Sequence, residues 1–280
     1  MNWIWFALIS VIAFSSSALL QRVVMKEENS DPVTSSVIFQ LTMAGITLVF
    51  ALFMGFNIPS VGLIPYFMIS AVLYAFGTLF FFRAAKELEA SELSILAGSG
   101  ALVTIAASYV FLGERFTGIQ LLGVLLILLA VVIVNVRKEK IVFKKGIWMG
   151  LLGNTCYALA VVSDGLILRN FDTFSFLAFM NILPATILIL AFPQKFPRLI
   201  HDVRHINRNL LAYSAVYVIA AETFYYPLKI GALVSQMSTI LKATTITTVL
   251  LAMIFLNEKS HPWKKLIGAI LTTVGILLIR

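Results

Sequence analysis

The sequence predicts an all-α polytopic membrane protein whose ten transmembrane helices form two inverted five-helix repeats. The first indication is composition: of 280 residues, 60% are hydrophobic and only 12% are charged, and the mean hydropathy is +0.97. This exceeds what the core of a water-soluble protein requires. The second indication is a regular alternation of long apolar stretches with short polar breaks, and the third is a similarity between the two halves of the chain.

Each apolar stretch is long enough to cross about 30 Å of hydrocarbon as a helix. The ten stretches are residues 3–24, 33–54, 63–82, 93–112, 119–136, 146–168, 174–192, 210–229, 233–256 and 266–279. The first lacks a preceding basic segment, so we interpret it as a retained helix and not as a cleaved signal peptide. The longest break, 193–209, contains two prolines and several charged residues. We expect a loop there, with at most one amphipathic turn.

No metal or other cofactor is expected. His201 and His205 have the i, i+4 spacing of a metal-binding pair, but the sequence places no recognisable third ligand nearby. The single cysteine, Cys156, lies inside a predicted span and excludes an intrachain disulfide.

The net charge of +8 would suit a nucleic-acid-binding protein, but the basic residues fall in the breaks between spans. Sixteen Lys and Arg residues fall on one side of the predicted membrane and four on the other, with Lys242 left inside a span. Because positively charged loops stay cytoplasmic, this count places both termini outside a plasma (inner) membrane. The expected partner is therefore a lipid bilayer and not a nucleic acid.

The two halves are related by an internal repeat. A shift of 144 residues superposes 81–114 on 225–258 without a gap and pairs Ser91 with Ser235 and Glu114 with Glu258. We therefore divide the chain into repeats at residues 1–140 and 141–280. Because each repeat has an odd number of spans, the second enters the membrane with opposite polarity, an arrangement typical of carriers. Two complete halves make a functional monomer the expected state.

Two short segments carry a family resemblance. Phe-Leu-Gly-Glu-Arg at 111–115 and Phe-Leu-Asn-Glu-Lys at 255–259, each followed by a glycine-containing span, resemble ten-helix EamA-like carriers of the drug/metabolite transporter superfamily. The resemblance implies a basket of helices around a cavity lined mainly by the first, third, fourth, sixth, eighth and ninth. It also implies cytoplasmic termini, contrary to the charge count, so the orientation stays open.

Glu222 and Lys242 are the leading site candidates. Both lie about ten residues from the turn between the eighth and ninth spans, which places them about 15 Å deep, near the bilayer midplane. A charge at that depth costs about 2.5 to 3.5 kcal/mol on insertion scales and usually marks a binding site or ion pathway. Their repeat mates, Thr78 and Gly98, are uncharged. The two side chains either form a salt bridge or meet a substrate of complementary charge.

Further polar and aromatic residues lie on the same predicted helix faces. Ser238 shares a face with Lys242, and Tyr226 shares one with Glu222. The remaining substrate-binding candidates are Ser10, Phe14, Tyr74, Thr78, Asn154 and Tyr157. Each of them alone is equally compatible with helix packing. Tyr213, Tyr217 and Phe224 form an aromatic stripe with Tyr225 beside it. These rings could stack on a flat substrate or hold a cation, or they could form an interfacial belt or pack against other helices, which is the preferred interpretation.

Three acids remain. Asp164 is a second proton-coupling candidate, but it ranks below Glu222 because it lies about one turn from its helix end, within reach of the interface. Glu114 and Glu258 stand at helix junctions beside a cation, so we interpret both as structural caps that interact with the amino end of the next helix.

The predicted function is secondary active transport or exchange of a small organic metabolite with an anionic group, such as an amino acid or organic acid. Lys242 would bind that group and Glu222 would balance it or exchange a proton. The alternatives are a flippase for a lipid-linked substrate, an exporter of cationic drugs, or a membrane protein that does not transport. The sequence contains no His-Glu-x-x-His helix and no Gly-x-Ser-x-Gly elbow, so an enzyme is not expected.

Overall fold

The computed structural model describes residues 3–27, 29–98, 100, 103, 117–137, 140–141, 145–168, 171–204, 206–229, 240–241, 243–258 and 261–279. Within these ranges the regular structure is helical, apart from one short hairpin. In that hairpin β1 (Val136–Arg137) pairs antiparallel with β2 (Lys140–Ile141). The prediction of a helical protein is confirmed for the described part of the chain.

A described helix overlaps each of the ten predicted stretches. The first half contains α1 (Trp3–Lys26), α2 (Pro32–Met54), η1 (Val61–Leu63), α3 (Ile64–Glu87), α4 (Ala90–Ala97) and α6 (Gly118–Asn135). The second half contains α7 (Lys145–Leu168), α8 (Thr173–Ala191), η2 (Pro193–Lys195), α9 (Phe196–Arg204), α10 (Arg208–Lys229), α12 (Ala243–Phe255) and α13 (Pro262–Ile279). Among the described residues, four helical segments are long and apolar enough to cross a membrane: Ile4–Lys26, Pro32–Met54, Val61–Glu87 and Thr173–Ala191.

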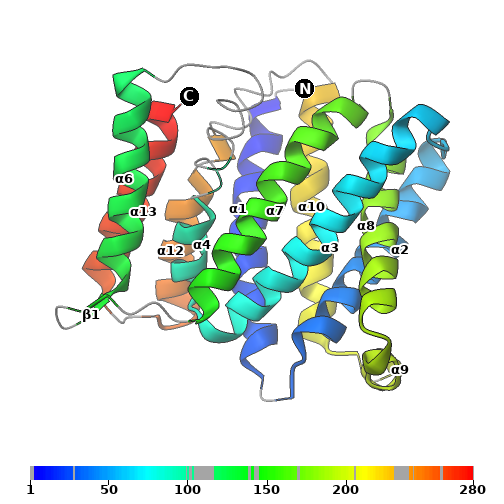
Figure 1. The fold of residues 1–280 in the computed structure, drawn as a ribbon, viewed down its shortest axis with the longest axis horizontal. Helices are drawn as coiled ribbons and strands as arrows, with labels where there is room; N and C mark the ends of the chain where they lie inside the picture. The colour runs from blue at the N-terminus through cyan, green and yellow to red at the C-terminus, as the bar shows by residue number, and fades with distance from the viewer. Residues whose placement is uncertain are drawn as a thin grey trace.

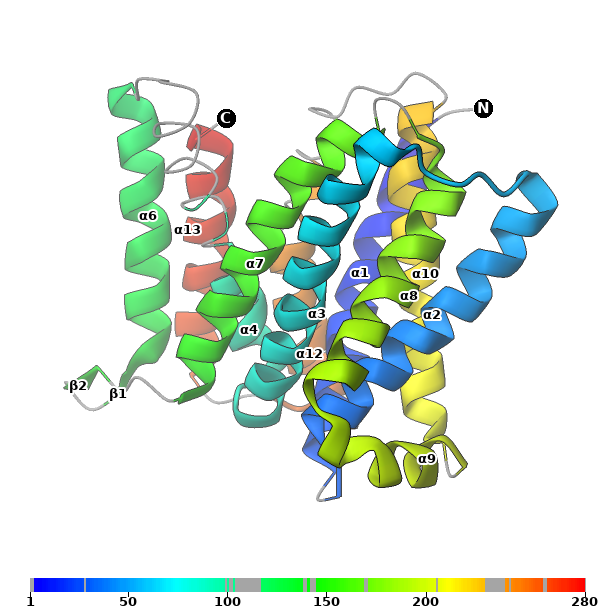
Figure 2. The ribbon, with the colours of Figure 1, turned by 45° about the vertical axis from the view of Figure 1, so that its right-hand side comes forward.

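The helices pack in pairs that join the two halves. The most extensive pairs are α3 with α7, α1 with α10, α6 with α13 and α2 with α8, and α4 also packs against α12. The α6 and α13 pair stands at one edge of the molecule, while the other helices form a closer group (Figures 1 and 2). Both chain termini lie at the same end, at the top of Figure 1.

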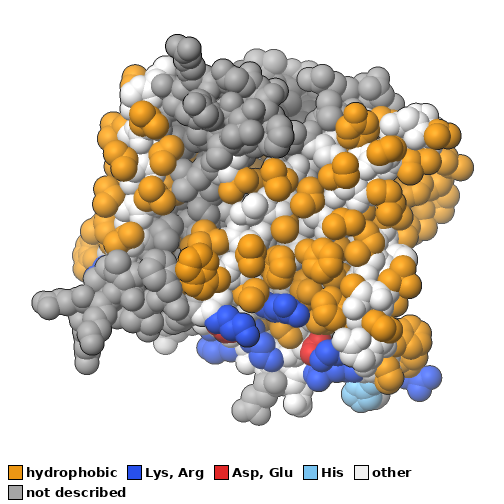
Figure 3. Space-filling view, in the orientation of Figure 1, with side chains coloured by type: hydrophobic (Ala, Val, Ile, Leu, Met, Phe, Trp, Pro, Cys, Tyr) orange, Lys and Arg blue, Asp and Glu red, His pale blue; other side chains and the backbone are white. Residues whose placement is uncertain are grey.

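The surface divides into an apolar flank and a charged end. Figure 3 shows hydrophobic side chains over the flank formed by the helices, whereas Lys and Arg side chains gather below it, at the end opposite the termini. We call this the basic end. The apolar flank matches a lipid environment, in which hydrophobic residues on the outside carry no penalty.

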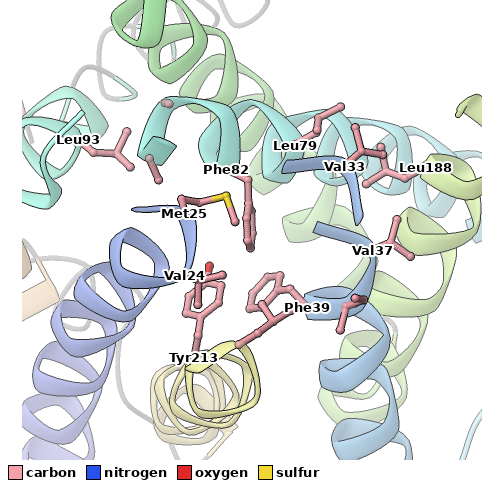
Figure 4. Packing of buried hydrophobic residues seen from close by; sticks show 14 of the residues in the cluster. Val24, Met25, Val33, Val37, Phe39, Leu79, Phe82, Leu93, Leu188 and Tyr213 are labelled. Atoms are coloured by element: carbon pink, nitrogen blue, oxygen red, sulfur yellow. The ribbon is translucent and has the colours of Figure 1, made fainter. Parts of the chain in front are cut away.

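A large apolar cluster fills the space between α1, α2, α3 and α10 toward the basic end (Figure 4). Phe39 stacks on Tyr213 with their ring centroids 4.3 Å apart, and Phe82 and Met25 are fully buried beside them. Along α1, α3 and α10 these residues lie closer to the basic end than the predicted site residues do. The cluster therefore separates the predicted site from the basic end.

The break 193–209 differs from its prediction. We expected a loop with at most one amphipathic turn, but residues Phe196–Arg204 form the complete helix α9. Pro197 falls in the first turn, where a proline costs no helical hydrogen bond. The proline that argued for a loop is thus compatible with a helix.

Asp31 fixes the start of α2. Its carboxylate accepts hydrogen bonds from the N–H groups of Val33 and Thr34 at 3.0 and 3.1 Å, and Lys195 Nζ lies 2.7 Å from its other oxygen. Burial raises the pKa of Asp31. The hydrogen bonds from Lys195 and Thr34 and the charges of Lys195 and Arg198 outweigh burial, so the pKa lies below its ordinary value.

We expect Asp31→Ala to destabilise the folded protein by about 1 kcal/mol, because α2 loses its cap. The apparent melting temperature of the detergent-solubilised protein should fall accordingly. Because the folded-state pKa is lowered, the stabilisation from the ionised group is present at neutral pH. It is lost as the pH falls through that lowered value, so the difference between wild type and variant should shrink on acidification. Asn29→Ala, at an exposed neighbouring position, is the control. Equal melting of all three proteins at neutral pH would contradict the role of Asp31.

Candidate functional site

A buried carboxylate joins α3 to α7. The hydroxyl of Ser70 donates to Asp164 Oδ1 at 3.0 Å, and the hydroxyl of Tyr74 donates to Asp164 Oδ2. Asp164 is only 3% exposed. The expectation that this side chain reaches the membrane–water interface is therefore wrong. The carboxylate points toward α3 instead, where two hydroxyl groups donate hydrogen bonds to it.

Thr78 and Tyr157 extend this contact toward the middle of the helices. Their hydroxyl oxygens lie 2.8 Å apart, and the Tyr157 ring packs edge-on against Tyr74 with centroids 5.3 Å apart. Tyr157 stands about midway along α7. We call Ser70, Tyr74, Thr78, Tyr157 and Asp164 the polar cluster. Four of its five members were predicted from the sequence.

The predicted residues of α1 pack against α10. Ser10 donates to the carbonyl oxygen of Ala220 at 3.0 Å, so its hydroxyl links two helices. Phe14 meets Tyr217 edge-on with centroids 5.4 Å apart. Tyr226 packs near Phe6, 5.3 Å between centroids, and is partly exposed. The observed contact of Ser10 is thus one of helix packing, which was the alternative to substrate binding for this residue.

Two tyrosines of α10 make ring contacts with other helices. Tyr217 meets Phe14 of α1 and Phe39 of α2 edge-on, and Tyr225 meets Phe176 of α8 edge-on. Ser70 was not predicted from the sequence. Ser70 precedes Tyr74 by four residues and Thr78 by eight, so extending the polar face of this helix by one turn would have found it.

Glu222 lies on α10 and is half-buried. Its Oε1 is buried and has no hydrogen-bond partner among the described residues. Its predicted partner Lys242 and the neighbouring Ser238 lie outside the described residues, so the proposed pair stays a prediction. Asn154 is buried and donates to the carbonyl oxygen of Leu96 at 3.3 Å, which ties α7 to α4.

A hollow of about 400 Å³ opens at the basic end. It is lined by Pro32, Arg83, Lys86, Glu87, Lys145 and Met149. None of the predicted substrate-binding residues belongs to this lining.

The comparisons with known proteins decide the family. A model of the EamA-like transporter family matches residues 1–136 and 144–280. The chain belongs to the EamA-like transporter family. Together with its apolar helices, this makes it an integral, multi-pass membrane protein.

Two further similarities accompany the family match. An uncharacterised protein of Methanocaldococcus jannaschii is 32% identical over 74 residues, which cover 26% of this chain and 54% of that protein. The match thus spans about half the length of that relative. A solved crystal structure superposes with a TM-score of 0.58 at 14% identity, over 96% of this chain and 95% of that one. This second likeness shows the fold alone.

One of the two recurring acids of this EamA-like chain caps a helix of the opposite half. Glu258 Oε1 accepts the N–H of Ala90 at 2.9 Å, and Oε2 accepts the N–H and hydroxyl of Ser91 at 3.2 and 2.6 Å. Lys265 Nζ lies 3.7 Å from Oε2 and also contacts Glu89. The predicted structural role is confirmed for Glu258, but the predicted helix is wrong, because the capped helix is α4 and not the next one along the chain.

The other recurring acid, Glu114, and the second histidine, His205, lie outside the described residues. His201 is exposed on α9, next to Asp202.

We expect Glu258→Ala to destabilise the protein by about 3 kcal/mol, because it leaves Lys265 with less compensation and the α4 amides without a cap. The measurement is the apparent melting temperature in detergent. Glu27→Ala removes an exposed carboxylate that accepts hydrogen bonds from Asn207 and Asn209 and should lower the melting temperature far less. If both variants melt alike, Glu258 does not hold the two halves together.

Proposed function

We propose that this protein is a secondary carrier that moves a small organic metabolite by alternating access between two inverted five-helix halves, residues 1–140 and 141–280. The two separate family matches support this division. The helix pairs support it as well. The first helix of one half, α1, pairs with the third helix of the other half, α10. A two-fold axis that exchanges the halves turns this pair into that of α7 with α3, which is also observed. Ten membrane crossings, five in each half, follow from this proposal.

The observation that carries the position of the substrate site is Glu222 Oε1, which is buried and has no hydrogen-bond partner among the described residues. A buried polar atom without a hydrogen bond costs about 1 to 3 kcal/mol, so a ligand that supplies one would be favoured at this position. Glu222 stands on the same helix as Tyr217 and Tyr225. A solute bound between α10 and the α3–α7 pair would meet a carboxylate, several hydroxyls and aromatic rings.

We propose a substrate with an anionic group, bound by Lys242, such as an amino acid or an organic acid. An amino acid would satisfy both charges, because its carboxylate suits Lys242 and its ammonium group suits Glu222. Tyr226, Ser238, Tyr74, Thr78, Asn154, Tyr157, Ser10 and Phe14 remain the proposed neighbours of the solute. The apolar cluster around Phe39 and Tyr213 would close the path toward the basic end in this conformation.

The test of substrate binding is a thermal-shift screen of the purified protein against amino acids and organic acids. A ligand that binds only the folded state stabilises that state by about 2.7 kcal/mol at one hundred times its Kd, and it thereby raises the apparent melting temperature. We expect a solute that stabilises wild type and the exposed control Lys26→Ala, but not Lys242→Ala. A shift retained in Lys242→Ala would remove this lysine from the site. Vesicles that move lipid reporters and no soluble metabolite would favour a flippase.

The test of proton coupling uses the same solute in vesicles with an imposed pH difference. We expect Glu222→Gln to keep exchange of labelled for unlabelled solute but to lose accumulation driven by the pH difference, because a neutral amide cannot carry the proton. Transport by Glu222→Gln that stays pH-sensitive and concentrative would exclude Glu222 as the coupling group.

A matched pair on α3 tests Asp164 as the second proton-coupling group. Tyr74→Phe removes a hydrogen bond to the Asp164 carboxylate, of a kind worth about 1.5 to 3 kcal/mol, and should change the pH profile of solute transport. Tyr66→Phe lies two turns away on the same helix, with an exposed ring, and should leave the profile unchanged. Identical profiles for the two variants would exclude Asp164.

A further inference from the structure

The helix α9 has two chemically distinct sides. Phe196, Ile200 and Val203, at i, i+4 and i+7, are 51%, 41% and 47% exposed and project from one side of the helix. Leu199 lies beside this apolar side and is 7% exposed. Arg198 and His201 occupy the opposite side, and Arg204 lies at the edge of the apolar side, next to Ile200 around the helix.

Several contacts fix α9 to the start of α2. Asp202 Oδ2 accepts a hydrogen bond from the hydroxyl of Thr34 at 2.7 Å, and Arg198 donates to the carbonyl oxygen of Asn29. Leu199 belongs to the same buried apolar cluster as Val33 and Leu188. The helix is therefore held in one orientation, and the exposure of its other apolar residues results from that orientation.

The helix α9 lies at the level where the apolar flank of the molecule ends. The helix lies across the basic end, between the end of α8 and the start of α10 (Figure 2). Leu190 in the last turn of α8 is 74% exposed, so lipid-facing surface continues to within a few residues of Phe196. A contiguous exposed apolar surface at this level fits lipid better than water.

The charge around α9 specifies the leaflet surface. Arg204, the last residue of α9, and Arg208, the first residue of α10, are exposed, and the Lys and Arg side chains visible in Figure 3 gather at this same end. Basic side chains beside an amphipathic helix add about 1 kcal/mol each to its attraction to anionic headgroups.

We propose that α9 is an interfacial helix that inserts Phe196, Ile200 and Val203 into the headgroup and acyl-chain boundary, with Arg204 and Arg208 against the phosphates of anionic lipids. An amphipathic helix lying in the plane of a bilayer buries its apolar side in this way. The inference concerns the lipid surface and does not depend on the transported solute.

The experiment compares two positions one residue apart on α9. In a Cys156→Ser background, a nitroxide label is attached to Ile200→Cys or to His201→Cys, and the protein is reconstituted in vesicles of phosphatidylethanolamine and phosphatidylglycerol. Electron paramagnetic resonance then measures collisions with lipid-soluble oxygen and with a water-soluble nickel chelate. We expect the label at 200 to meet oxygen and to be protected severalfold from nickel relative to the label at 201.

Val203→Cys repeats the measurement on the apolar side in case labelling at 200 disturbs the helix. Labels at 200 and 203 that meet nickel as often as the label at 201 would overturn the proposal. Replacing phosphatidylglycerol by phosphatidylcholine should raise the nickel collisions of the label at 200. Unchanged collisions would overturn the contact with anionic headgroups.

Discussion

A polar group in hydrocarbon has no water to bind, and the packing of this protein depends on that constraint. Apolar side chains do not drive membrane helices together, since lipid tails are equally apolar, so polar contacts and close packing must do so. The Ser10 hydroxyl meets the Ala220 carbonyl, and Asn154 meets the Leu96 carbonyl. Asp164 is satisfied by Ser70 and Tyr74. Each of these contacts joins helices from opposite halves of the chain.

The same constraint sets Glu222 apart. The other buried side chains discussed here find a partner on a neighbouring helix, whereas its Oε1 finds none among the described residues. Gln40, Thr272 and Thr273 also have a buried oxygen without a partner among the described residues, but Glu222 is the one of the four that can carry a charge. A charged group is costlier to leave unpaired than a neutral one, which is why the proposed mechanism assigns a solute to Glu222.

Much of this architecture could be predicted from the sequence, because the length of an apolar stretch depends on local composition alone. Such local patterns predicted where the helices lie, and they also predicted Tyr74, Thr78, Tyr157 and Asp164 of the polar cluster. The partner of Glu258 did not, since the contact with Ser91 spans 167 residues and no spacing along the chain encodes it. The burial of Asp164 likewise depends on which face of α7 meets α3. The helix α9 was missed because two prolines were given more weight than the spacing of Phe196, Ile200 and Val203.

The cap that Glu258 places on α4 bears on whether the two parts of the chain can be separated. Residues 1–140 expressed alone would leave the N–H groups of Ala90 and Ser91 uncapped. Residues 141–280 alone would bury the charges of Glu258 and Lys265 without Ser91 and Glu89. Each part of the chain therefore depends on the other for its stability.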